Sequence, residues 1–86
     1  MAKVLTYTVD YCPYCKKAKA LLREKGVDFE DIDITANEDE MREKLSEITG
    51  GRTTVPQIFI NGVHVGGYTD LKALNDSGKL DEMLIT

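Results

Sequence analysis

The spacing of hydrophobic residues predicts three elements in the first half of the chain. Residues 3–9, KVLTYTV, are rich in β-branched side chains and predict a short, mostly buried strand. Residues 13–25 carry apolar side chains at helical spacing and predict a helix, with Pro13 in its first turn and Gly26 as a left-handed cap. Residues 29–34, FEDIDI, predict a second strand, whose acidic residues indicate a wet face or an edge position.

The second half of the chain begins with another predicted helix. Asn37 and Glu40 have the spacing of a capping pair, and apolar residues follow at helical spacing as far as Ile48. Gly50 and Gly51 are expected to end this helix.

A hairpin is the next predicted element. Residues 57–60, QIFI, form an apolar strand, and the dipeptide Asn61-Gly62 favours a type I′ turn. Residues 63–65, VHV, are the returning strand of this hairpin.

The last part of the chain predicts a third helix. Gly66 and Gly67 break the returning strand, and Thr69 or Asp70 is expected to cap the helix that follows. Residues 80–85, LDEMLI, predict a final short helical turn.

These elements follow the order β-α-β-α-β-β-α, with the final helical turn added. A strand–helix–strand unit implies two parallel strands and a right-handed crossover, whereas a two-residue hairpin must be antiparallel. A chain of 86 residues has no room for a second core. We therefore expect an α/β fold with a mixed four-stranded sheet and flanking helices, in a single domain of residues 1–86.

The composition is ordinary for a globular protein, with 42% hydrophobic and 30% charged residues. A net charge of −4 argues against a general nucleic-acid binder, which would show a basic face. The N-terminus lacks the pattern of a signal peptide, and every apolar run is far shorter than the ~20 residues of a membrane span. We therefore expect a cytoplasmic protein.

Charge is distributed unevenly along the chain. Residues 16–25 are mainly basic and residues 28–47 are mainly acidic. One interpretation is two solvated helix faces of opposite sign. The other is that the basic cluster favours an anionic species near the cysteines that precede it.

The chain's only two cysteines, Cys12 and Cys15, are separated by Pro13 and Tyr14. A disulfide between them would close a very short loop and add little stability, and the reducing cytoplasm disfavours structural disulfides. A closed zinc site requires four ligands, whereas the chain adds only His64 to the pair. Both structural roles are therefore disfavoured.

The position of the cysteines favours redox chemistry instead. The start of a helix offers unpaired N–H groups and the positive end of the helix dipole, and Lys16 and Lys17 add positive charge. These features favour a thiolate, which is the reactive form of cysteine. Cys15 lies one turn further into the helix than Cys12, so we expect it to be less exposed and to suit a resolving role. A Cys-x-x-Cys pair near a strand–helix–strand pattern indicates a thioredoxin-like redox protein.

Three stretches of the chain together resemble a known family. They are YCPYCKKAKALL at the first helix, GRTTVPQIFINGVHVGG in the middle and YTDLKAL at the third helix. In this order, and over nearly the whole chain, they resemble the short bacterial dithiol glutaredoxins. The resemblance implies a thioredoxin-like fold and a glutathione-dependent thiol–disulfide oxidoreductase that reduces protein disulfides and glutathionylated thiols.

The resemblance also implies a role for each motif. Cys12 is the nucleophile and Cys15 its resolving partner. Pro56 is in the cis form, so that the Val55 backbone pairs with an extended thiol peptide. The residues implied to bind glutathione are Tyr14, Thr54, Val55, Pro56, Gly67, Tyr68, Thr69 and Asp70.

One position departs from the family pattern. Many glutaredoxins have a lysine three residues before the first cysteine, where it meets the glycine carboxylate of glutathione. This chain has Val9 at that position, and Arg42 and Arg52 are the two candidates to replace the missing cation. His64 is expected to be a surface or packing residue rather than a catalyst.

Two alternatives to this function stay open at the level of the sequence. A glutaredoxin-like redoxin reduced by thioredoxin reductase would use the same cysteines, although the Thr-Val-Pro and Gly-Tyr-Thr-Asp motifs favour glutathione. An iron–sulfur scaffold would join two chains and two glutathiones, although Pro13 opposes it. We expect a monomer that uses glutathione as co-substrate without a metal. Its expected partners are disulfide-containing or glutathionylated proteins, and neither nucleic acid nor a membrane.

Overall fold

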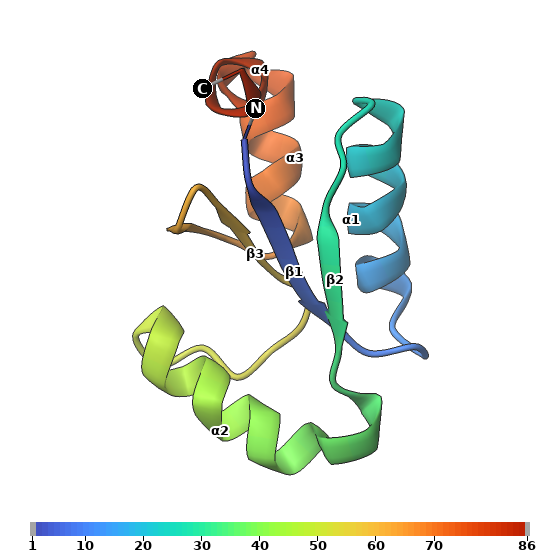
Figure 1. Ribbon diagram of the computed structural model, residues 1–86, viewed down its shortest axis with the longest axis vertical. Coiled ribbons are helices and arrows are strands. Elements are labelled where there is room, and N and C mark those ends of the chain that lie inside the picture. The colour runs from blue at the N-terminus through green and yellow to red at the C-terminus, as the bar shows by residue number, and fades with distance from the viewer. Residues whose placement is uncertain (1, 86) are drawn as a thin grey trace.

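The computed structural model describes residues 2–85, which form a mixed four-stranded sheet with flanking helices (Figure 1). The strands lie in the order β2-β1-β3-β4, in which β1 and β2 are parallel and the other two pairs are antiparallel. Asn61 (φ 52°) and Gly62 (φ 80°) join β3 to β4 with the positive φ angles of the predicted type I′ turn. The predicted sheet and the edge position of the acidic strand β2 are confirmed. The strands are β1 (Val4–Thr8), β2 (Glu30–Asp33), β3 (Gln57–Ile60) and β4 (Val63–Gly66).

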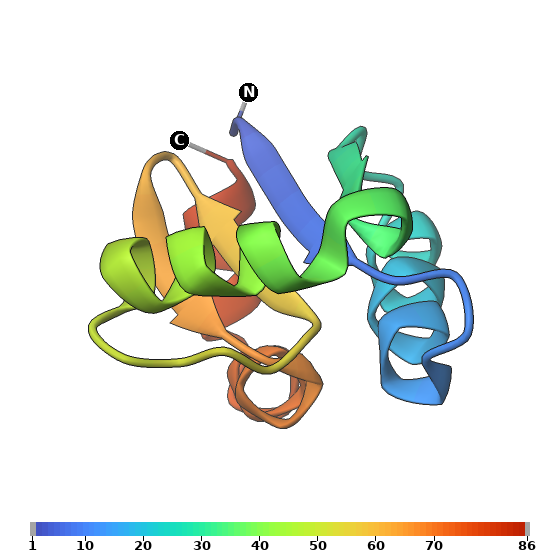
Figure 2. The ribbon, with the colours of Figure 1, turned by 90° about the horizontal axis from the view of Figure 1, so that it is seen from below.

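The helices follow the predicted order. They are α1 (Pro13–Glu24), α2 (Glu38–Thr49), α3 (Tyr68–Asp76) and α4 (Lys79–Leu84), and a 3-10 turn, η1 (Thr35–Asn37), precedes α2. α1 and α3 contact each other, whereas α2 lies apart from them at the lower end of the molecule in Figure 1. In Figure 2, α2 runs across the view in front of the strands. None of the helices within residues 2–85 has the length and apolar character that crossing a membrane requires.

Each face of the sheet carries a buried cluster, because successive strand residues point to opposite sides and helices pack against both sides. One face packs against α1, α3 and α4, and its buried residues are Val4, Ala18, Leu22, Ile58, Ile60, Leu71 and Leu80. The other face packs against α2, and its buried residues are Tyr7, Val9, Ile34 and Leu45. β1 contributes to both clusters and leads directly into the loop before α1. The core therefore fixes the base of the segment that carries the first cysteine.

Asn37 directly precedes α2, as the sequence predicts, but the capping interaction differs from the prediction. Asn37 makes no side-chain capping bond, so the predicted Asn37–Glu40 capping pair is wrong. The turn η1 leads into the helix instead, and three acidic residues occupy the first turn of α2. Negative side chains at this place interact favourably with the helix dipole, so the helix start is stabilised without the capping pair.

The start of α3 also differs from the prediction. Gly67 is the cap residue and the helix begins at Tyr68, so the expectation that Thr69 or Asp70 would be the cap is wrong. Asp70 accepts a hydrogen bond from the Gly67 N–H at 3.0 Å. A glycine has no side chain with which to cap a helix, and the acidic residue three positions later supplies the reciprocal half of a capping box.

Candidate active site

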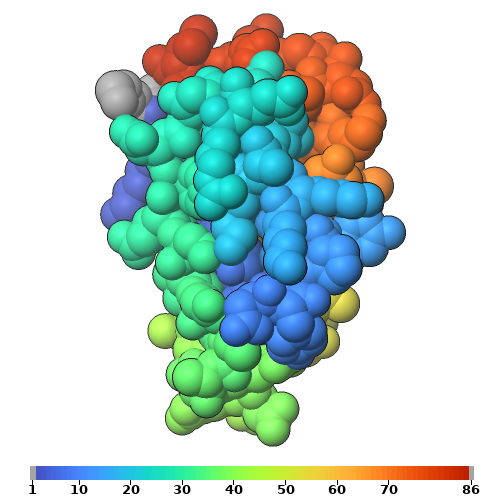
Figure 3. Space-filling model, turned by 90° about the vertical axis from the view of Figure 1, so that its right-hand side faces the viewer, coloured from blue at the N-terminus to red at the C-terminus, as the bar shows by residue number. Residues whose placement is uncertain are grey.

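Cys12 caps α1, and its sulfur lies at the start of the helix. The residue has an extended backbone (φ −92°, ψ 117°), and its Sγ accepts a hydrogen bond from the Cys15 N–H at 3.3 Å. A helix-start N–H directed at sulfur favours negative charge there. The start of α1 lies at the molecular surface, where Figure 3 shows it in blue. The predicted position of Cys12 at the helix start is confirmed.

Cys15 has a different environment one turn further along α1. Its side chain is fully buried, whereas Cys12 is half-buried, and both are free thiols. Burial raises the pKa of the Cys15 thiol to about 12, so this sulfur keeps its proton at neutral pH. The pair thus combines one accessible sulfur with one that is protected from solvent.

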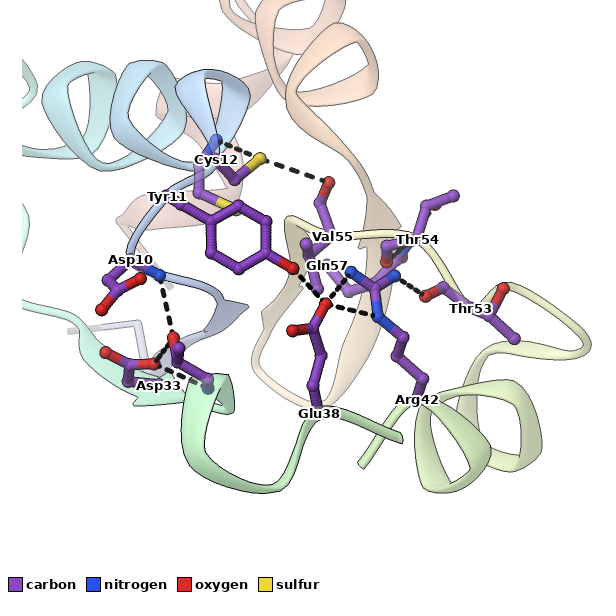
Figure 4. Close-up of polar contacts among 12 residues, drawn as sticks. Asp10, Tyr11, Cys12, Asp33, Glu38, Arg42, Thr53, Thr54, Val55 and Gln57 are labelled. Carbon is purple, nitrogen blue, oxygen red and sulfur yellow. Dashed lines mark hydrogen bonds and ion pairs between the residues drawn. The ribbon is translucent and has the colours of Figure 1, made fainter. Parts of the chain in front are cut away.

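The loop before β3 faces Cys12. The Val55–Pro56 peptide bond is cis, as the resemblance implies. The Cys12 thiol donates to the Val55 carbonyl, with 3.8 Å between sulfur and oxygen (Figure 4). Arg42, on α2, donates from Nη1 to the Thr53 carbonyl at 2.7 Å. The loop is therefore held by α2 while it presents the Val55 backbone beside the accessible sulfur.

A cavity of about 240 Å³ brings the predicted ligand residues together. Its walls come from α1, the loop before β3 and the start of α3. The lining residues are Tyr14, Arg52, Thr54, Val55, Pro56, Gly67, Tyr68, Thr69 and Asp70. All eight residues implied by the resemblance for glutathione binding belong to this set, and the fold adds Arg52 to them.

Asp70 supplies negative charge to this cavity. Its Oδ2 accepts hydrogen bonds from Arg52 Nη1 and from the Gly67 N–H, each at 3.0 Å. The hydrogen bond from Arg52, followed by that from Gly67, lowers the pKa of the Asp70 carboxyl. The carboxylate is therefore ionised at neutral pH, and it is paired with a cation on the same wall.

The aromatic part of the cavity is formed by two tyrosines. The ring centres of Tyr14 and Tyr68 lie 6.1 Å apart, and Lys17 Nζ lies 5.3 Å from the centre of the Tyr14 ring. This distance is within the range of a cation–π contact. Lys17 thus faces the Tyr14 ring rather than a cysteine sulfur. The hypothesis that Lys16 and Lys17 stabilise a thiolate stays a prediction.

A second cavity, of about 330 Å³, has Tyr11 and Arg42 in its wall, and both bond to Glu38 in a group that sequence reasoning missed. Glu38 accepts hydrogen bonds from the Tyr11 hydroxyl and from Arg42 Nε and Nη2, the latter two at 3.1 and 2.7 Å (Figure 4). The four-residue spacing of Glu38 and Arg42 on α2 is a sequence signal for this ion pair. Tyr11 joins the pair through a tertiary contact that no local pattern predicts. The cavity is lined by Val9, Tyr11, Cys12, Pro13, Arg42, Thr54 and Val55.

His64 lies on β4, and its ring centre is 5.1 Å from that of Phe59. His64 therefore packs against β3 within the hairpin, as the sequence analysis expects, and it also lies within hydrogen-bond distance of Gln57. Within residues 2–85, no group of three or more His, Cys, Asp or Glu side chains is arranged to hold a metal ion.

The fold and the site define a class of protein. A Cys-x-x-Cys pair at the start of the first helix of a strand–helix–strand unit is the arrangement of a thiol–disulfide oxidoreductase. The family model for glutaredoxin matches residues 4–65. Glutaredoxin 3 of Escherichia coli (strain K12) is 50% identical over 84 residues, which are 98% of this chain and 99% of that protein. The chain belongs to the glutaredoxin family.

Solved structures show the same relationship at the level of the fold. The solution structure of a glutaredoxin from Brucella melitensis is 54% identical with a TM-score of 0.84, over 98% of this chain and 89% of that chain. The crystal structure of a buckwheat glutaredoxin–glutathione complex is 30% identical with a TM-score of 0.90, over 98% of this chain and 77% of that chain. The predicted thioredoxin-like fold is confirmed, and the protein is a thiol–disulfide oxidoreductase.

Proposed function

We propose that this protein catalyses glutathione-dependent reduction of protein disulfides and glutathionylated thiols. The observation that carries the proposal is the cavity beside Val55, in which all eight residues implied for glutathione binding meet. The buckwheat relative, which was solved as a glutaredoxin–glutathione complex, supports the choice of ligand. Glutathione is the co-substrate in this proposal, disulfide-containing and glutathionylated proteins are the partners, and the protein acts as a cytoplasmic monomer.

Cys12 is the nucleophile in the proposed reaction. Its thiolate attacks one sulfur of the substrate disulfide, and the other sulfur leaves as a thiolate that takes up a proton. The helix-start N–H groups favour the thiolate before the attack. The Val55 backbone pairs with the extended substrate, as an added strand pairs with a sheet edge. The product of this step is a mixed disulfide on Cys12.

Cys15 resolves a mixed disulfide formed with a protein. Its sulfur attacks the Cys12 sulfur, the Cys15 proton passes to the departing protein thiolate, and a Cys12–Cys15 disulfide forms. Burial of Cys15 keeps this thiol from reacting with solvent species before that step. Two glutathione molecules then reduce the disulfide and leave as glutathione disulfide. With a glutathionylated substrate, Cys12 and a second glutathione suffice.

The start of α3 holds the γ-glutamyl end of glutathione in this proposal. The N–H groups of the first turn donate to its carboxylate, because a helix N-terminus is a favourable site for an anion. The ionised Asp70 accepts from its amino group in a charge-assisted hydrogen bond. The hydrogen bond that Asp70 accepts from the Gly67 N–H and binding of the ligand are compatible, since a carboxylate accepts several hydrogen bonds.

Arg42 is the residue that we propose for the glycine carboxylate. It shares the second cavity with Val9 and Cys12, whereas Arg52 is paired with Asp70 in the first cavity. A guanidinium has five N–H donors. Within the described residues, Arg42 uses three donors on Glu38 and the Thr53 carbonyl and also contacts the Tyr11 hydroxyl, so a ligand carboxylate would share the guanidinium with these groups.

Replacing Arg42 tests this assignment. We expect Arg42→Ala to raise the KM for a glutathionylated peptide about tenfold, because a charge-assisted hydrogen bond is lost. The control substrate is the same peptide with the glycine carboxylate of glutathione esterified, for which wild type and variant should differ by less than about twofold. An equal loss on both substrates would show that Arg42 acts only through Thr53, and the assignment would be wrong.

The choice of reductant tests the proposed function itself. We expect reduction of a glutathionylated peptide in the presence of glutathione, NADPH and glutathione reductase. We expect no comparable turnover when thioredoxin reductase replaces glutathione and its reductase. Turnover with thioredoxin reductase alone would reject the proposal and would favour a redoxin of the other type.

A further inference from the structure

Gln57 is a fully buried polar residue at the start of β3, directly after Pro56. Its side-chain nitrogen donates to the Thr54 carbonyl at 2.9 Å and lies 3.2 Å from the Thr54 hydroxyl oxygen. A carbonyl oxygen only accepts hydrogen bonds, so the amide nitrogen must face Thr54 and the amide oxygen must point the other way. The orientation of the Gln57 side chain is thus determined by its chemistry.

His64 holds the other side of this amide. Its Nε2 lies 2.7 Å from Gln57 Oε1, and because an amide oxygen only accepts, Nε2 must carry the proton and donate it. Burial, followed by the positive charge of Arg52, lowers the pKa of His64, so the ring is mostly neutral at pH 7. Protonation would keep the hydrogen bond, since an imidazolium also carries a proton on Nε2.

This chain of hydrogen bonds ends at the loop that faces the accessible cysteine. Thr54 directly precedes Val55, whose carbonyl lies 3.8 Å from Cys12 Sγ. We propose that Gln57 and His64 are positioning residues for thiol–disulfide exchange. They fix the Thr54 carbonyl from inside the protein and thereby hold the Val55 backbone in the position where it pairs with the substrate.

The hydrogen-bond count explains why His64 matters at a distance from the sulfur. Without the His64 donor, the buried Oε1 of Gln57 loses the partner that the structure gives it. The amide regains a partner only by rotating, and rotation withdraws its nitrogen from Thr54. A loop that is no longer held must be ordered each time substrate binds, so the loss appears in KM more than in kcat.

Two replacements of His64 in the full chain test the inference. His64→Phe keeps a ring against Phe59 but has no donor, whereas His64→Gln places an amide nitrogen the same number of bonds from Cα as Nε2. With a glutathionylated peptide as probe, we expect His64→Phe to raise KM about five- to tenfold and to change kcat less than about twofold. The KM and kcat of His64→Gln should each lie within about twofold of the wild-type values. A KM for His64→Phe equal to that of the wild type would overturn the inference.

The side-chain amide protons of Gln57 give a second readout that needs no substrate. In hydrogen exchange followed by NMR, we expect them to be protected in the wild type and in His64→Gln, and to exchange faster in His64→Phe. Protected backbone amides in β1 show that each variant is folded. Unchanged exchange of the Gln57 amide in His64→Phe would overturn the inference as well.

The choice of probe rests on the proposed function, and the experiment separates the two. Wild-type turnover with glutathione is measured first. If it is absent, the proposed function fails, and the KM comparison is made with a disulfide-containing peptide and a dithiol reductant. The exchange of the Gln57 amide decides on the hydrogen-bond network in either case.

Discussion

Cys12→Ser reduces thiol–disulfide exchange to the uncatalysed background, whereas Cys15→Ser keeps reduction of small glutathionylated substrates at about the wild-type rate. Only the half-buried Cys12 is accessible to a substrate sulfur, and a serine hydroxyl does not replace a thiolate as nucleophile. The measurement is glutathione-linked turnover of a glutathionylated peptide by wild type and by both variants.

The two variants also separate the roles of the cysteines on a protein disulfide. Cys15→Ser should accumulate a mixed disulfide between Cys12 and the protein substrate, visible by mass spectrometry, because the resolving thiol is missing. Wild type should release the reduced protein under the same conditions. An active Cys12→Ser variant, or a Cys15→Ser variant that is inactive on the small substrate, would reverse the assignment.

Gly66→Ala is the second change with a large expected effect. Gly66 has φ +121°, and a Cβ there would lie 2.2 Å from Asp70 Oδ2 and 3.0 Å from Arg52 Nη1. Asp70 must move away and lose its bonds to Gly67 and Arg52, while the backbone is strained. We expect a loss of about 2–3 kcal/mol in the free energy of unfolding and a fall in Tm of about 10 °C or more. The KM for a glutathionylated peptide should rise at the same time.

Gly62→Ala is the matched control for this change. Gly62 also has positive φ (+80°), but a Cβ there meets nothing within 4 Å. We expect Gly62→Ala to lower the free energy of unfolding by only about 1 kcal/mol and to leave the KM for the glutathionylated peptide unchanged. A double variant separates the clash with Asp70 from the backbone strain. In an Asp70→Ala background, adding Gly66→Ala should cause no further rise in KM. A KM effect that persists there would show that Gly66 acts without Asp70.

Local patterns predicted most of the elements because their causes are local. The β-branched residues of β1, the apolar run of β3, the Asn61-Gly62 turn and the apolar stripe of α1 depend on residues a few positions apart. The same holds for Cys12 at the helix start. The capping bond at Asn37 and the cap residue of α3 were predicted wrongly, because several nearby polar residues compete at one helix end and the sequence does not rank them.

The candidate site was predictable only in part. The resemblance named eight ligand residues, and the structure places them in one cavity. The group of Tyr11, Glu38 and Arg42 was missed, because the Tyr11 hydroxyl reaches Glu38 across 27 positions of sequence. The link from His64 to the loop before β3 was missed for a similar reason, since it depends on how the β3–β4 hairpin packs.

The sequence by itself determined the order of elements, the place of both cysteines on one helix turn and the family to which the chain belongs. These properties follow from short-range spacing and from motifs, which do not depend on tertiary contacts. The structure confirms the expected protection of Cys15 and shows that its burial is complete. The tertiary structure alone decided that Arg42 rather than Arg52 shares a cavity with Cys12, and that Asp70 reaches back to Gly67. Burial and cavity walls depend on which distant segments the fold brings into contact, and that information is absent from any local stretch of the chain.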